Sequence, residues 1–156
     1  MKLKFLIIFF SFLWPFFSSG QILNPVKWEG HYKELPNNEG EIIITATIDS
    51  HWHIYSQRVS DAGPVPTSFV FSEAKAFQLI GKTEEENAKE EFDKAFDAKI
   101  FVFTGKAIFK QKIKRLNLKT FSTVIKLEYM TCNDEKCLPP KTVDLTINIP
   151  ETTAKK

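Results

Sequence analysis

The chain has 156 residues, with 21 lysines and arginines, 19 aspartates and glutamates, and a formal net charge of +2. Lys2 and Lys4 belong to an N-terminal export signal, and without them 19 residues of each sign remain. This balance excludes a nucleic-acid-binding role driven by net positive charge.

Residues 1–20 have the parts of a secretory signal peptide. The two lysines precede an apolar run from Phe5 to Phe17, which is too short to span a bilayer. Small residues at 18–20 predict cleavage before Gln21, and no cysteine nearby suits a lipid anchor. We therefore expect a soluble, exported protein of one domain, residues 21–156, in an oxidising compartment.

Short apolar segments with period-two alternation follow, separated by turn residues, and no internal repeat is visible. Eight or nine such strands predict a β-sandwich or barrel. Gly63-Pro64-Val65-Pro66 predicts a rigid extended turn, and Thr104-Gly105-Lys106 predicts a hairpin turn. The predicted strands lie around Val26, Trp28 and Tyr32, and at residues 41–49, 53–57, 67–71, 77–83, 100–103, 107–113, 121–131 and 142–149.

Residues 84–99 are the one segment with helical potential. They are acidic, with Phe92 and Phe96 four positions apart, so a short helix and an ordered loop are both open. Composition alone favours a solvated connection. The two phenylalanines argue that part of the segment is buried.

The only two cysteines, Cys132 and Cys137, lie four residues apart between the last two predicted strands. Asn133-Asp134 supplies turn chemistry, so the cysteines are expected at the loop end of a β-hairpin. Pro139-Pro140 lacks two amide donors, and strand pairing is expected to begin at about Lys141.

A disulfide between these cysteines has two possible interpretations. As a staple it closes a short loop and contributes only about 2 kcal/mol. As a redox pair it opens and closes during function. No helix N-terminus is predicted nearby to lower a thiol pKa. We therefore expect thiols of ordinary reactivity, which react with a more reactive cysteine of a partner protein.

His51-Trp52-His53 is a second candidate. If these residues form a strand, both histidines point to one face and Trp52 to the other. With the two cysteines they would complete a Cys2His2 metal set. Histidines at a strand start are more often surface or turn residues, and we expect no stoichiometric zinc or copper and no cofactor.

Three stretches resemble the N-terminal periplasmic domain of the thiol:disulfide interchange protein DsbD. The most specific is the hairpin 127–143, with Cys132 followed by Cys137-Leu138-Pro139-Pro140; residues 48–55 and 63–67 also match. The resemblance covers about residues 28–149. It implies an all-β, immunoglobulin-like sandwich with a redox hairpin at one end.

In that family the two hairpin cysteines pass electrons from the membrane domain of DsbD to periplasmic thioredoxin-like proteins, under a loop that bears a phenylalanine. Carried over by position, Cys132 and Cys137 are the redox pair. Phe96 best matches the phenylalanine of the loop that covers the cysteines, which we call the cap, and Phe92 is the second choice. The aromatic strand beside the cysteines then contains Trp52 and Tyr55.

Two features depart from the family. Its best-known members have one more residue between the cysteines than the four found here, and this chain stops at Lys156. The chain thus resembles a free-standing copy of one domain. Its electron donor is then a separate transmembrane protein of DsbD type, and its acceptors are periplasmic thioredoxin-like or disulfide-isomerase proteins.

The resemblance favours a thiol:disulfide oxidoreductase, acting as a protein-disulfide reductase. The alternative is a non-enzymatic envelope binding module with a structural disulfide. A weaker alternative is a copper or zinc binder that uses His51, His53 and the cysteines.

Overall fold

A computed structural model gives the structure of the chain and describes residues 23–59, 63–72 and 75–152. The predicted signal peptide, residues 1–20, lies outside these ranges. The regular elements of the described residues are strands, and none of these residues forms a helix that could cross a membrane. The strands are β1 (Val26–Leu35), β2 (Glu39–Ile48), β3 (His53–Tyr55), β4 (Ser68–Phe71), β5 (Phe77–Glu86), β6 (Lys89–Asp93), β7 (Ala98–Thr104), β8 (Lys106–Arg115), β9 (Phe121–Cys132) and β10 (Cys137–Ile149).

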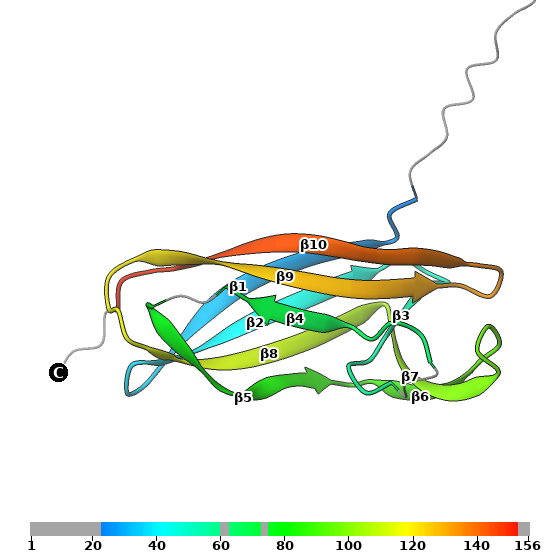
Figure 1. Cartoon of the computed structure of the whole chain (residues 1–156), viewed down its shortest axis with the longest axis horizontal. Coiled ribbons are helices and arrows are strands. Elements are labelled where there is room, and N and C mark those ends of the chain that lie inside the picture. Colours follow the sequence, from blue (N-terminus) through cyan, green and yellow to red (C-terminus); the bar gives the residue numbers. More distant parts are fainter. Residues whose placement is uncertain (1–22, 60–62, 73–74, 153–156) are drawn as a thin grey trace, which may run out of the picture.

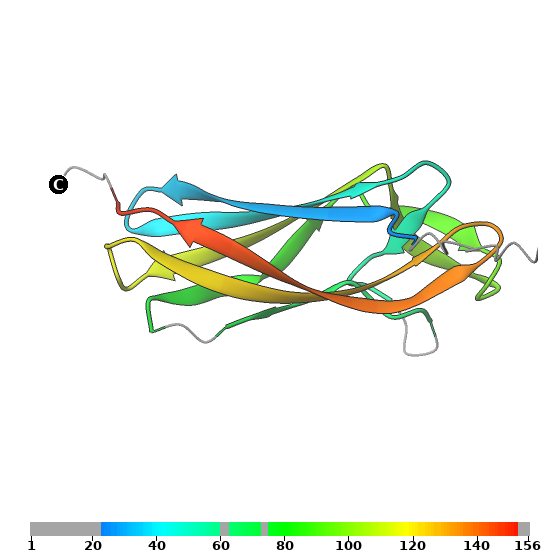
Figure 2. The same ribbon diagram turned by 90° about the horizontal axis from the view of Figure 1, so that it is seen from above.

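The strands form two sheets that pack as an elongated sandwich (Figures 1 and 2). One sheet has the order β1-β2-β8-β5, and the other has the order β10-β9-β3-β7-β6, with β4 also paired to β9. The turn between β9 and β10 lies at one end of the long axis, next to the turn between β6 and β7. The all-β, immunoglobulin-like sandwich predicted from the sequence is confirmed.

The main core lies between the sheets because one face of each long strand is apolar. In β2, Ile42 and Ile44 are fully buried, while Ile43 between them is partly exposed. Ile125 and Leu127 on β9 are buried in the same way from the opposite sheet. Alternate side chains of both strands thus fill the core.

Gly30 allows β10 to pack closely over β1. A Cβ atom at Gly30 would lie 2.3 Å from Ile147 Cδ1 and 2.7 Å from Leu145 Cδ2. The glycine that interrupts the apolar face of β1 in the sequence is therefore the place where side chains of the other sheet reach the β1 backbone.

Most of residues 84–99 form strands and none of them forms a helix, so the expected short helix is wrong and an ordered loop is present only in part. β5 extends to Glu86, and β6 and β7 pair around a turn at residues 94–97. Charged residues suit these strands because β5 and β6 are sheet edges whose outer side chains reach water. Across the β5–β8 pair, Lys110 Nζ lies 2.5 Å from Glu86 Oε1.

Thr104-Gly105-Lys106 does not close a hairpin, contrary to the sequence prediction. β7 pairs with β3 and β6, whereas β8 pairs with β2 and β5. The turn therefore carries the chain from one sheet to the other. Gly105 takes a φ of 68° there, which glycine adopts without strain, and its carbonyl accepts a hydrogen bond of 2.8 Å from the Ile48 amide.

Pairing of β9 with β10 begins at the cysteines and not near Lys141 as predicted. Cys137 pairs with Cys132, and Leu138 pairs with Thr131. The register then shifts before pairing resumes between Lys141 and Tyr129. Two prolines thus lie opposite one residue, as in a β-bulge, which accommodates their missing amide donors.

Candidate functional site

Cys132 and Cys137 form a disulfide across the residue pair that closes the β9–β10 hairpin, with their Cα atoms 4.0 Å apart. Asn133 shapes the turn. Its Oδ1 accepts hydrogen bonds from the amides of Glu135 and Lys136 at 3.0 and 2.8 Å. The predicted hairpin, with an asparagine that bonds its own backbone, is therefore present.

The disulfide lies on the outer face of the six-stranded sheet, away from the main core. Residues paired directly across antiparallel strands share a face. Because His53 pairs with Cys132 and Cys132 pairs with Cys137, the three form a row across β3, β9 and β10. Ile54, next to His53, and Leu127, five residues before Cys132, have the opposite orientation and belong to the main core.

A second, smaller apolar cluster surrounds the disulfide on this outer face. Its buried members are Tyr55, Ile100, Val102 and Cys132. Cys132 is 1% exposed, whereas Cys137 is only partly buried. Cys137 is therefore the more accessible of the two cysteines. The partly buried residues packed against the cluster are Val59, Phe96, Ala98, Met130 and Cys137.

The turn at residues 94–97, which we call the cap segment, brings Phe96 to this cluster. Asp93 holds the segment, because its Oδ1 accepts hydrogen bonds from the amides of Ala95 and Phe96 at 2.8 and 3.3 Å. The Phe96 ring meets Tyr55 edge-on, with ring centroids 5.9 Å apart and an interplanar angle of 85°. An aromatic ring on a turn thus packs in the same cluster as both cysteines.

Asp93 also connects the cap segment to β3. Its Oδ2 accepts a hydrogen bond of 2.6 Å from the Tyr55 hydroxyl and lies 3.3 Å from His53 Nε2. Burial acts to raise the pKa of Asp93, but hydrogen bonds from Tyr55, Ala95 and Phe96 and the charge of nearby His53 lower it below its ordinary value. Burial and the bond to Asp93 raise the pKa of Tyr55. At neutral pH the site therefore holds an ionised carboxylate and a neutral phenol.

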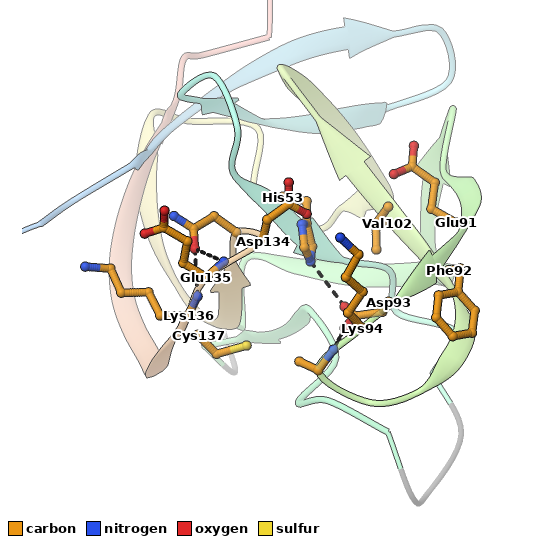
Figure 3. A pocket seen from close by; sticks show the side chains of 12 residues that line it. His53, Glu91, Phe92, Asp93, Lys94, Val102, Asp134, Glu135, Lys136 and Cys137 are labelled. Carbon is orange, nitrogen blue, oxygen red and sulfur yellow. Dashed lines mark hydrogen bonds and ion pairs between the residues drawn. The ribbon is translucent and has the colours of Figure 1, made fainter.

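A cavity of about 390 Å³ opens beside the disulfide (Figure 3). The hairpin turn 133–136 and Cys137 form one wall, and residues 91–95 form the other, with His53 and Val102 between them. The Cys137 sulfur points toward the side of the cavity where Asp93 and Lys94 lie. One cysteine of the pair thus borders a space that another molecule can enter.

The other sequence-predicted residues are placed as follows. Tyr55 lies in the cluster with the cysteines, whereas Trp52 lies in the main core. Phe92, the second choice for the cap, is 61% exposed and borders the cavity. Phe96 is the phenylalanine that packs with the cysteines. The roles of these four residues as cap and lining stay predictions.

Asp93 was not identified from the sequence. It lies 38 residues from Tyr55 and 40 from His53, and one aspartate in a charged segment gives no local signal. The pairing of β6 with β7 and of β7 with β3 brings these residues together. Only the strand order could have indicated this group, and the sequence does not reveal that order.

Three features of the structure concern the residues of the metal alternative. His51 lies in a turn with a φ of 67°, so it does not share a strand with His53, and that premise is wrong. Both cysteines are in the disulfide. Within residues 23–59, 63–72 and 75–152, no group of three or more His, Cys, Asp or Glu side chains is arranged to hold a metal ion.

Replacing Asp93 with asparagine is expected to lower the free energy of unfolding at pH 7 by about 1–2 kcal/mol, since hydrogen bonds to a charged acceptor are lost. The folded-state pKa of Asp93 is lowered, so its stabilisation is present above the unfolded-state pKa and is lost as pH falls through the folded-state pKa. Urea unfolding between pH 2 and 7 should show a shallower decline in acid for the variant.

Asp97→Asn is the matched control for that measurement. Asp97 lies on the same cap segment, is exposed and has a φ of 50°, which asparagine tolerates. Its pH–stability curve should follow the parent protein. Equal acid slopes for the parent and Asp93→Asn would mean that Asp93 does not hold the segment as an ionised group.

The family model described as "Thiol:disulfide interchange protein DsbD, N-terminal" matches residues 21–148 of this chain. No curated protein matches this chain. The N-terminal periplasmic domain of ScsB from Proteus mirabilis is 12% identical, with a TM-score of 0.50 over 80% of this chain and 44% of that chain. At that identity the likeness concerns the fold alone.

Two solved structures from Neisseria meningitidis are also similar. The reduced N-terminal domain of DsbD is 17% identical, with a TM-score of 0.49 over 70% of this chain and 75% of that chain. A complex of the DsbD N-terminal domain with the PilB N-terminal domain gives 12% identity and a TM-score of 0.49, over 76% of this chain and 80% of that chain.

Proposed function

The chain belongs to the family of N-terminal domains of the thiol:disulfide interchange protein DsbD, and on this premise we propose that Cys132 and Cys137 form a working dithiol–disulfide relay. The relay takes electrons from a transmembrane reductase of DsbD type. It passes them to thioredoxin-like or disulfide-isomerase proteins. One observation supports the proposal most directly: the disulfide lies on an outer sheet face, and Cys137 borders a cavity.

The relay follows ordinary thiol–disulfide exchange. In the reduced protein, one cysteine thiolate attacks a sulfur of the partner's disulfide. A mixed disulfide forms, and the partner's second sulfur leaves as a thiolate that takes up a proton. The other cysteine then attacks the mixed disulfide, which leaves Cys132–Cys137 oxidised and the partner with two thiols. Two electrons and two protons have moved to the partner.

We assign the first attack to Cys137. This cysteine is partly exposed and borders the cavity, whereas Cys132 is 1% exposed and lies inside the apolar cluster. A partner sulfur can approach Cys137 without disturbing the main core. Cys132, directly opposite on β9, is then placed to resolve the mixed disulfide. The resemblance to the family supports the same order.

Phe96 serves this relay as a cap over the sulfurs. An exported dithiol meets oxidants and disulfides that are not its substrates, so restricted access protects it. The Phe96 ring lies on a turn, which can move when a partner docks without the loss of core packing. The cap segment depends on Asp93 for two of its amide hydrogen bonds.

The proposed location is the periplasm. Residues 1–20 have the sequence of an export signal, and a disulfide is stable in an oxidising compartment. Membership of the family supports the same compartment.

The reduction potential of the pair tests this function. A working relay is expected above about −300 mV, and a purely structural disulfide is expected below it. The measurement equilibrates the purified protein with defined dithiothreitol redox buffers and counts free thiols by a mass-shifting alkylating agent. A value well below about −300 mV would favour an envelope binding module stapled by a structural bond.

A further inference from the structure

His53 is the titratable side chain nearest in register to the disulfide. It lies directly opposite Cys132 in the β3–β9 pair, and side chains paired in this way have Cβ atoms roughly 5 Å apart. Its ring also borders the cavity that Cys137 borders. His53 therefore lies beside one cysteine in the sheet and shares an open space with the other.

The hydrogen bonds of the ring assign its tautomer. The Tyr55 hydroxyl has one proton, which it donates to Asp93 Oδ2 at 2.6 Å. His53 Nε2 lies 3.1 Å from the Tyr55 hydroxyl oxygen and 3.3 Å from Asp93 Oδ2. Both of these oxygens act as acceptors toward the ring, so Nε2 carries the proton.

The second ring nitrogen, Nδ1, is then the basic one in the neutral ring. Among the described residues it has no hydrogen-bond partner. The side chain is 21% exposed, so the ring is anchored at Nε2 but not sealed from the cavity. A carboxylate that holds one imidazole nitrogen and leaves the other free is the arrangement that orients histidine for proton transfer.

We propose that His53 exchanges protons with the cysteine pair during disulfide interchange, and that Asp93 and Tyr55 are the positioning residues that hold its ring. This inference rests on the proposed relay. No local sequence pattern indicates it, because His53 and Asp93 lie 40 residues apart in the chain.

The proton steps balance with the relay. Neutral His53 accepts the proton of the Cys137 thiol, and the resulting thiolate attacks the partner's disulfide. The S–S bond to Cys137 forms, the partner's S–S bond breaks, and the protonated ring gives its proton to the leaving thiolate. His53 then accepts the Cys132 proton, Cys132 attacks the Cys137 sulfur, and the second partner thiolate takes that proton.

The other charged groups around the cavity are mixed in sign. Asp93 contacts the ring directly, with its Oδ2 3.3 Å from His53 Nε2. The remaining charged residues of the cavity are exposed, so salt screens their influence. They comprise two cations and three anions: Lys94, Lys136, Glu91, Asp134 and Glu135.

The first test uses the unaltered protein. Its three histidines are His31, His51 and His53, so ring signals can be followed by NMR from pH 4 to 9 in the reduced and disulfide forms. The titration midpoint of His53 should differ between the two forms by about half a pH unit or more, because the thiols and the ring share protons. His31 and His51 should titrate identically in both forms. A His53 midpoint that is the same in both forms would overturn the proposal.

The second test measures thiol reactivity. Iodoacetamide alkylation of the reduced protein is followed against pH for the parent, His53→Gln and His51→Asn. Loss of an imidazolium beside the thiol should move the His53→Gln profile upward by about one pH unit, which makes alkylation about tenfold slower at pH values below the midpoint. His51→Asn is the matched control: His51 is exposed, and asparagine tolerates its φ of 67°.

Superimposable profiles for the parent and His53→Gln would refute the proposal, whereas a changed rate with an unchanged midpoint would indicate a structural effect only and would also refute it. Both tests use this protein and small reagents alone. They therefore report on His53 even if the reduction potential argues against the relay, and the two failures are distinguishable.

Discussion

Replacing Cys137 with serine is expected to abolish reduction of a thioredoxin-like disulfide partner, because a hydroxyl can neither attack the partner as a thiolate does nor form a mixed disulfide. The fold should survive. The bond closes a loop of four residues, which is worth only about 2 kcal/mol, against about 5–15 kcal/mol for a typical domain. Mixing the reduced variant with an oxidised thioredoxin-like protein and counting the partner's thiols measures the loss.

Cys132→Ser is the matched variant, and it should behave differently. Cys137 can still attack, but no second thiol resolves the product, so a mixed disulfide should accumulate on a non-reducing gel. Accumulation with Cys137→Ser instead would reverse the order of attack. A double serine variant that cannot fold would show that the bond is structural, and the relay would lose its main support.

The main core was predictable because its signal is local. Alternation of apolar and polar residues decides which face of a strand is buried, and in β9 it places Ile125 and Leu127 in the core between exposed neighbours. The β9–β10 hairpin was also predictable, since an asparagine turn separates two such strands. The resemblance added the architecture, which alternation alone left open between a sandwich and a barrel.

Strand partners were less predictable because pairing is decided by contacts distant in the sequence. Thr104-Gly105-Lys106 has the composition of a hairpin turn, yet it connects two sheets. Nothing local distinguishes the two outcomes. Residues 84–99 look like a solvated connection because edge strands have few buried side chains, and their charges pair with neighbours such as Lys110 that the sequence cannot place beside them.

The residues of the candidate site also differ in whether a local sequence pattern indicates them. The cysteine pair and Phe96 carry features that can be read in one stretch of sequence. The group of Asp93, Tyr55 and His53 comes from two strands, β3 and β6, that lie far apart in the sequence, and it has no motif. His51 does not share a strand with His53 because β3 starts only at His53. A three-residue strand gives too short a pattern to set which residues share its face.

Replacing Phe96 with alanine is expected to speed alkylation of the reduced thiols by iodoacetamide by about tenfold. The ring packs in the cluster with both cysteines and meets Tyr55 edge-on at 5.9 Å. An aromatic pair of this kind contributes about 1 kcal/mol beyond its buried area, and a loss of about 1.4 kcal/mol makes the open state about tenfold more populated. The melting temperature should change little, because Phe96 is only partly buried and lies outside the main core.

Phe92→Ala separates the cap from a general loosening of the same segment. Phe92 lies four residues earlier, is 61% exposed and is outside the cysteine cluster, so its removal should leave the alkylation rate unchanged. Faster alkylation with Phe92→Ala but not with Phe96→Ala would move the cap to Phe92. An unchanged rate in both variants would remove the cap altogether. The relay would still stand in that case, because exchange depends on the two sulfurs, while the cap controls only which molecules reach them.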